Sequence, residues 1–151
     1  MNTKIVLASS SPRRVELLKN CHINFETATH NFDEDSHKFT NPIKYAKELA
    51  YGKANSISKE EFFDRYILGV DTIVEFNGKI LGKPKDKKEA ENNMKMLSNK
   101  THRVISGISI VNRKNNIKFI EYSLSKVTFN KLDDKFIQFY LDNNLFIGYA
   151  G

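Results

Sequence analysis

Three serines, a proline and two arginines stand together in the stretch LASSSPRRVELL, residues 7–18. Ordinary turns use glycine, asparagine or aspartate, and this stretch has none of them. A helix N-terminus collects unpaired N–H donors and positive charge, so it suits an anion. Hydroxyls of Ser9 and Ser11 and guanidinium groups of Arg13 and Arg14 would add donors that match phosphate oxygens. The stretch predicts a phosphate site, while a simple serine cap with solvent-facing arginines stays open as the alternative.

Asp71 is a carboxylate in an apolar, strand-like stretch, YILGVDTIV at 66–74. Aspartate is depleted from strands and from protein interiors unless it is paired. We therefore expect Asp71 to have a lysine or a metal as its partner. A carboxylate placed this way could orient a metal or take a proton from water, and the alternative is a structural ion pair.

Two lysines and an acidic loop complete the candidates. Lys53, in AYGKA, and Lys83, in GKP, could clamp phosphates, although most lysines are solvated surface. The loop at 30–40 carries Asp33, Glu34 and Asp35, one of which could bind Mg²⁺ beside substrate phosphates. An ordinary charged loop is the simpler interpretation.

The histidines and the cysteine suggest no further chemistry. The four histidines show no metal-ligand spacing and we assign them no catalytic role; they are His22, His30, His37 and His102. The single cysteine, Cys21, excludes an internal disulfide and a cysteine-based zinc site. The single cysteine favours a reduced, cytoplasmic setting.

The elements that must position these residues follow from periodicity and from turn signals. Strands are expected at 4–8, at 24–29, on both sides of Asn77-Gly78 within 66–81, and as a hairpin over 101–132 that turns at 114–116. Helices are expected at 12–20, 42–57, 86–97 and 133–144, and an extended segment at 145–151. The fold class is therefore α/β, a mixed sheet flanked by helices.

Composition sets the outer bounds. The chain has 151 residues, 40% hydrophobic and 28% charged, which fits one compact domain or two small lobes that share a cleft. No stretch has the roughly 18 apolar residues of a membrane span, and the first residues do not form a signal peptide. The net charge of +6 attracts polyanions, although a solvated lysine-rich surface explains it equally well.

Together these stretches resemble the Maf family, the septum-formation-associated nucleoside triphosphate pyrophosphatases. The matching motifs follow one another in the family's order: LASxSPRRxELL at 7–18, FDE at 32–34, KA at 53–54, GxDTIV at 69–74, LGKP at 81–84 and THxVxSG at 101–107. The agreement covers nearly the whole chain, so we treat residues 1–151 as a single Maf-like domain.

The resemblance implies a twisted mixed sheet with flanking helices, related to the inosine triphosphate pyrophosphatases, with two lobes around a cleft. It implies a hydrolase of acid anhydrides that cleaves a nucleoside triphosphate between its α and β phosphates, with Mg²⁺ or Mn²⁺. The SPRR and DT pair is similar to the branch that acts on dTTP and UTP. Family analogy also suggests a homodimer, and neither a membrane nor a nucleic acid as partner.

The resemblance also implies a role for each matching residue. Asp71 is the proton acceptor, and Glu34 helps Asp71 with the metal. Arg13 and Thr72 match positions associated with the choice of base. The remaining matches handle phosphates: Ser9, Arg13, Lys53 and Lys83, with Ser11 and Arg14 of the same motif beside them.

Two departures from the family pattern matter. Gly52 stands before Lys53 where the family usually has a longer polar side chain, and glycine weakens a helix by about 1 kcal/mol relative to alanine. The family's AGAYGIQG is present only as YAG at the end of the sequence, so the strands and helix that would follow are expected to be missing. A nucleotide-binding protein with impaired catalysis is therefore the alternative function. A basic nucleic-acid binder is a third, without a motif to support it.

Overall fold

The computed structural model describes residues 5–34, 40–57 and 60–149. The strands are β1 (Ile5–Leu7), β2 (Phe25–Thr27), β3 (Tyr66–Phe76), β4 (Lys79–Leu81), β5 (Thr101–Asn112) and β6 (Ile117–Thr128). The helices are α1 (Pro12–Asn20), α2 (Pro42–Asn55), a short 3-10 turn η1 (Glu60–Phe62), α3 (Lys87–Leu97) and α4 (Asp134–Asp142). No helix within these ranges is long and apolar enough to cross a bilayer.

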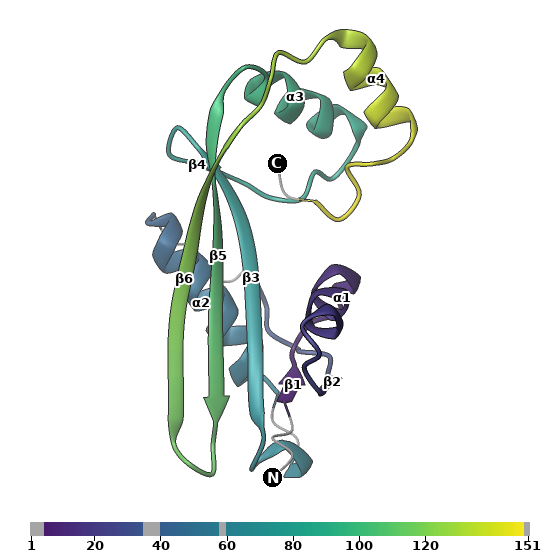
Figure 1. Cartoon of the computed structure of the whole chain (residues 1–151). Helices are drawn as coiled ribbons and strands as arrows, with labels where there is room; N and C mark the ends of the chain where they lie inside the picture. Colours follow the sequence, from purple (N-terminus) through teal and green to yellow (C-terminus); the bar gives the residue numbers. More distant parts are fainter. Residues whose placement is uncertain (1–4, 35–39, 58–59, 150–151) are drawn as a thin grey trace. The chain divides into compact units, whose positions relative to one another are not determined.

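The strands form one mixed sheet in the order β2-β1-β3-β5-β6, with β4 paired to β3 (Figure 1). β1 runs parallel to both β2 and β3, and Leu7 lies opposite Leu68. β4 runs antiparallel to β3, with Val74 opposite Leu81. The mixed sheet with flanking helices confirms the predicted fold class.

The two predicted hairpin turns are present. Asn77 and Gly78 join β3 to β4 with φ of 50° and 81°, the left-handed conformation that this dipeptide adopts easily. Four residues, 113–116, join β5 to β6, and Asn116 has a φ of 52°. Both turns therefore follow directly from local sequence.

Helix starts follow from caps and prolines. Asn41 accepts a hydrogen bond from the backbone N–H of Lys44 at 3.0 Å, and Pro42 begins α2. Asp86 accepts from the N–H of Glu89 at 2.8 Å, as the capping-box spacing predicts. Ser11 stands at the cap position of α1, but its side chain makes no capping bond within the described part of the chain.

The chain divides into two compact units, which we describe separately. Unit 1 comprises 1–71 and 106–123, and unit 2 comprises 72–105 and 124–151. The core of unit 1 gathers around Ile67 and Val6, and its other members are Ala8, Ala54, Ile57, Phe62 and Val111. Unit 2 has one cluster around Met94 and Ile137 and another around Leu97. Each unit thus has apolar packing of its own.

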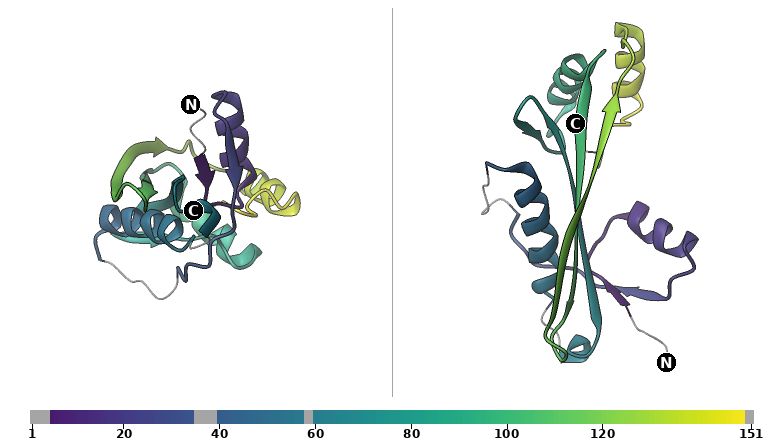
Figure 2. Two further views of the ribbon diagram at one scale, coloured as in Figure 1. Left: turned by 90° about the horizontal axis from the view of Figure 1, so that it is seen from below. Right: turned by 60° about the vertical axis from the view of Figure 1, so that its left-hand side comes forward.

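In unit 1, helix α2 lies directly on the strands (Figure 2). A Cβ added at Gly69 in β3 would lie 2.1 Å from the carbonyl oxygen of Ala50, and one at Gly107 in β5 would lie 2.1 Å from that of Ala46. Only glycine permits such close contact between a helix and a strand. Two glycines therefore set the depth at which α2 packs.

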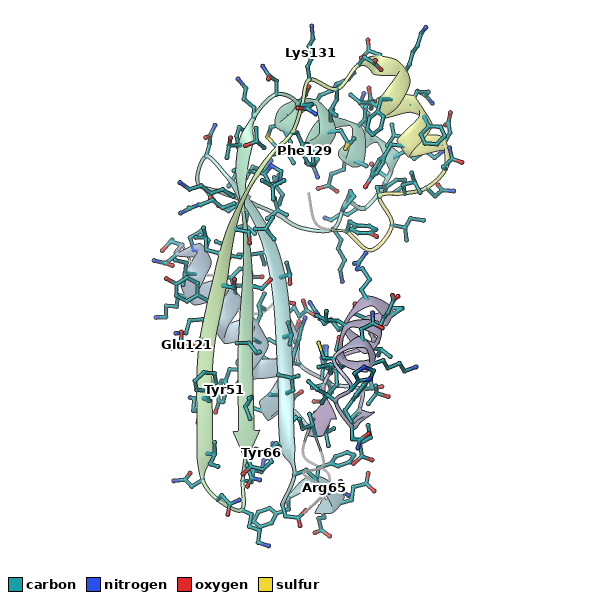
Figure 3. The ribbon with its side chains drawn as sticks, viewed as in Figure 1. Tyr51, Arg65, Tyr66, Glu121, Phe129 and Lys131 are labelled. Carbon is teal, nitrogen blue, oxygen red and sulfur yellow. The ribbon has the colours of Figure 1, made fainter. Side chains whose placement is uncertain are left out.

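Side-chain contacts hold the outer elements of unit 1. Tyr51, labelled in Figure 3, projects from α2, and the Nζ of Lys118 in β6 lies 3.8 Å from its ring centre. Arg65, just before β3, donates from Nη1 to Glu26 of β2 at 3.0 Å. These contacts are partly exposed, so they add little stability individually.

The extended segment predicted at 145–151 is wrong for the residues that the structure describes. After α4 the chain forms successive turns, in which the N–H of Ile147 donates to Asn144 and that of Tyr149 to Phe146, both at 3.2 Å. Asn144 and Gly148 take positive φ values of 54° and 81°, which curl the backbone. An apolar run followed by glycine is compatible with an extended segment and with successive turns. The positive φ values that follow the end of α4 produce the turns.

Candidate active site

Unit 1 contains a buried ion pair. The side chain of Lys53 is 6% exposed, and its Nζ donates to Oδ1 of Asp71. The same Nζ lies 3.0 Å from Oε1 of Glu34, whose side chain is 42% exposed. One ammonium group thus joins two carboxylates, which confirms the expectation that Asp71 has a partner.

The packing of α2 explains why these side chains meet. Gly69 and Asp71 are two residues apart in β3, so they face the same side of the sheet. Ala50 and Ala54 pack on Gly69. Lys53, between them on α2, is therefore held beside Asp71. The two-residue spacing of Gly69 and Asp71 therefore places the carboxylate next to the point where α2 packs on the strand.

Phe32 explains the glycine at position 52. A Cβ added at Gly52 would lie 2.3 Å from the ring of Phe32, so this position of α2 leaves room for the ring. Phe32 is two residues before Glu34, and its packing positions the loop that brings Glu34 to Lys53. Gly52 weakens the helix locally, but it also leaves room for the ring of Phe32.

The serine turn, defined here as Ser9–Ser11, lies beside the ion pair because β1 and β3 are parallel neighbours. The N–H of Ala8 donates to the carbonyl of Leu68 at 2.8 Å, which places Ser9 alongside the Gly69–Asp71 segment. Ser9 is 5% exposed, and its Oγ accepts from the N–H of Ser11 at 3.2 Å and from Nη1 of Arg14 at 3.1 Å.

Of the two arginines, Arg14 is the one directed to the buried side. It is half-buried, and the charges of Asp71 and Glu34 raise its pKa, although burial lowers that pKa more strongly. Arg13 is exposed at the start of α1. The structure thus brings together Ser9, Ser11, Arg14, Lys53, Glu34 and Asp71.

Burial dominates the electrostatics of Asp71. It raises the pKa of the carboxyl group, and the charge and hydrogen bond of Lys53 offset only part of this rise. The nearby cations were expected to lower this pKa and keep Asp71 ionised, as a general base requires, but burial outweighs them. Asp71 is consequently a stronger base than an exposed aspartate.

His30 is the residue that sequence reasoning missed. Its Nδ1 is buried and has no hydrogen-bond partner among the described residues. Burial lowers the pKa of His30, and the charges of Lys53, Glu34, Asp71 and Arg14 all act on it. The only hint in the sequence was that His30 lies four residues before Glu34, in the acidic loop. A search for metal-ligand spacing among the histidines does not find such a residue.

Three predicted residues stay outside this description. Thr72 follows Asp71 in β3 but belongs to unit 2, as does the exposed Lys83 after β4. Asp35 lies outside the described residues. The roles of Thr72 and Lys83 remain predictions. Among the residues that the structure describes, no three His, Cys, Asp or Glu side chains form a group that could hold a metal ion by themselves.

Comparisons with known proteins give consistent results. The family model described as "Maf-like protein" matches residues 4–151. A dTTP/UTP pyrophosphatase of Clostridium novyi is 44% identical over 91% of this chain and 73% of its own length. One of Alkaliphilus oremlandii is 40% identical over 92% and 72%. The solved structure of the Staphylococcus aureus Ham1 protein superposes with a TM-score of 0.57 at 14% identity, covering 82% of this chain and 70% of that one, and it supports the fold alone.

Proposed function

The chain belongs to the Maf-like protein family, and from this we propose that it is a nucleotide pyrophosphatase that converts dTTP and UTP to the monophosphate and pyrophosphate. The observation that carries the proposal is the buried carboxylate of Asp71, held by Lys53 alongside the serine turn. The relatives named dTTP/UTP pyrophosphatases support the choice of substrate.

The cationic and hydroxyl groups around Asp71 suit a triphosphate. Arg14 offers a planar guanidinium group, and Lys53 a compact ammonium group, both partly removed from water. Arg13 and Lys83 would extend the same contacts.

Asp71 is the proposed general base. A water molecule attacks the α phosphorus, its proton passes to Asp71, and the bond from that phosphorus to the β-phosphate oxygen breaks to release pyrophosphate. The burial that raises the pKa of Asp71 makes its carboxylate a stronger proton acceptor. Thr72, next to Asp71, and Arg13 are proposed to contact the base.

Glu34 and Asp71 fit a divalent cation such as Mg²⁺ or Mn²⁺. Both contact the same ammonium group of Lys53, so their oxygens lie close together, and Mg²⁺ takes one or two carboxylates beside substrate phosphates. A bound cation would neutralise charge on the phosphates. Lys53 would then bind phosphate instead of both carboxylates.

The Asp71→Asn variant tests the proposal. Pyrophosphate release from dTTP and UTP should fall by about 10²- to 10⁴-fold, because the amide cannot accept the proton. Thermal unfolding of the variant serves as the control for folding. Turnover at the wild-type rate would remove Asp71 from the assigned role.

A panel of nucleoside triphosphates tests the substrate. Faster release from dTTP and UTP than from purine nucleotides is the expected result. Saturable dTTP binding without pyrophosphate would instead identify a nucleotide-binding protein with impaired catalysis. Tighter, salt-sensitive binding to DNA would favour a nucleic-acid binder. A cytoplasmic homodimer is the proposed form.

A further inference from the structure

Two contacts join the described part of the acidic loop, residues 30–34, to helix α2 in unit 1. The Nζ of Lys53 lies 3.0 Å from Oε1 of Glu34. Its neighbour Gly52 faces the ring of Phe32, because a Cβ added at Gly52 would lie 2.3 Å from that ring. Two consecutive residues of the helix thus contact two side chains of one loop, the first contact apolar and the second charged.

The charged contact is the weaker anchor of the two. The side chain of Glu34 is 42% exposed, and an ion pair open to water is screened and must immobilise flexible side chains. Phe32 is half-buried, and its rigid ring fills the space that a Cβ at residue 52 would occupy. The position of the loop therefore depends more on the ring than on the carboxylate.

The position of Glu34 matters because it shares one ammonium group with Asp71. Both carboxylates contact the Nζ of Lys53, so a displacement of Glu34 changes the separation of the two. Mg²⁺ accepts its oxygen ligands only in near-ideal octahedral geometry, which makes this separation important for a bound cation. Residues that orient a metal ligand are typically worth about 10- to 100-fold in metal affinity or activity.

We propose that Phe32 and Gly52 are positioning residues of this site. The ring of Phe32, packed against Gly52, determines where the carboxylate of Glu34 lies. Through Glu34 it determines how the carboxylates of Glu34 and Asp71 are arranged around Lys53. This inference rests on the proposed function, because it concerns the role of Glu34 beside Asp71. Both residues act through Glu34 and are assigned no contact with the nucleotide.

The Gly52→Ala variant tests the contact, because its methyl group would overlap the ring of Phe32 and displace Glu34. The Mg²⁺ concentration for half-maximal pyrophosphate release from dTTP should rise roughly 10- to 100-fold, with little change in KM for dTTP at saturating Mg²⁺. Adding Phe32→Leu to Gly52→Ala makes room for the methyl group and should recover most of this loss. The control is Phe63→Leu, at a 55% exposed phenylalanine of the same unit, and it should keep the wild-type Mg²⁺ dependence.

Unfolding temperatures separate this role from a merely structural one. Alanine favours a helix over glycine, so a structural role predicts a Gly52→Ala protein that is at least as stable as the wild type and has an unchanged Mg²⁺ dependence. That result would overturn the inference. A double variant with Phe32→Leu that recovers nothing would also overturn it.

Crystal structures of the wild type and Gly52→Ala measure the positions without any activity. A greater distance from Oε1 of Glu34 to Nζ of Lys53 in the variant than in the wild type supports the inference. An unchanged distance overturns it, even when the wild type hydrolyses dTTP. A displaced Glu34 in a protein whose wild type releases no pyrophosphate would contradict the proposed function alone.

Discussion

The buried pair of Lys53 and Asp71 makes the free energy of unfolding sensitive to a single substitution. Both side chains are buried, at 6% and 10% exposure, so each compensates the charge of the other. Lys53→Met would leave Asp71 buried without its cation, and breaking such a pair typically costs about 3–5 kcal/mol. We expect a loss of this size in the free energy of unfolding, measured with urea.

The exposed Lys131, labelled in Figure 3, is the matched control for this loss. Lys131→Met should change the free energy of unfolding by less than about 0.5 kcal/mol. Adding Asp71→Asn to Lys53→Met should recover part of the loss, because the uncompensated charge is gone. A Lys53→Met protein as stable as the wild type would show that the pair contributes nothing to folding.

The raised pKa of Asp71 predicts how stability depends on pH. A carboxyl group with a higher pKa in the folded state stabilises the fold below its unfolded pKa, and this contribution is lost as pH rises through the folded pKa. Asp71→Asn does not titrate, so its stability relative to the wild type should increase from pH 3 to pH 7. Urea unfolding of both proteins across this range measures the difference. If the stability of Asp71→Asn relative to the wild type decreased as pH rises, Lys53, and not burial, would determine the pKa of Asp71.

At the scale of elements, the depth at which α2 packs on β3 controls the site. A Cβ at Gly69 would lie 2.1 Å from the carbonyl oxygen of Ala50, and backbone atoms cannot give way as a flexible side chain can. Gly69→Ala should therefore push α2 outward, separate Lys53 from Asp71 and cost about 1–3 kcal/mol. The rate of pyrophosphate release should fall as well, because Lys53 no longer lies beside Asp71.

Gly82 provides the control for Gly69. A Cβ at Gly82 would have no described atom within 4 Å, and its φ is not positive. Gly82→Ala is expected to leave the unfolding temperature nearly unchanged. If Gly69→Ala behaved like Gly82→Ala, the close packing of α2 would not be what positions Lys53.

The pKa of a second buried carboxylate, Glu75, is shifted in the opposite direction to that of Asp71. Glu75 lies in β3 within unit 2, and its hydrogen bond from Nε of Arg103 lowers its pKa. A lowered folded pKa stabilises the fold above the unfolded pKa, and the contribution disappears as pH falls through the folded pKa. Glu75→Gln should therefore lower the unfolding temperature at pH 7 and converge with the wild type below about pH 4. A constant difference across this range would contradict the role of charge.

The elements most visible in the sequence were those with a local chemical cause. Pro42 after Asn41, the Asn77-Gly78 turn and the capping box at Asp86 each determine their own backbone, so their positions could be predicted. Tertiary contacts decided the rest. Nothing local to Gly52 shows that it faces Phe32, and nothing local to His30 shows that its ring lies within electrostatic range of Lys53 and Asp71.

At the scale of the whole molecule, the residues that the structure brings together around Asp71 belong to unit 1, whereas Thr72 and Lys83, whose roles are proposed, belong to unit 2. Ser9, Arg14 and Glu34 come from the first half of unit 1, and Lys53 and Asp71 from α2 and β3. Unit 2 contains the helix α4. Several of its large apolar side chains near α4 are exposed: Phe136, Phe139, Leu145, Ile147 and Tyr149.

These exposed side chains predict the association behaviour of the chain. Exposed apolar side chains favour contacts with other molecules, and Phe139 is 59% exposed on α4. Phe139→Lys should lower the apparent mass measured by light scattering at high protein concentration, without lowering the unfolding temperature. Ile137, 4% exposed on the same helix, is the control, because Ile137→Lys would place a charge in the core of unit 2 and destabilise it. Equal masses for the wild type and Phe139→Lys at every concentration would show that this surface does not drive association.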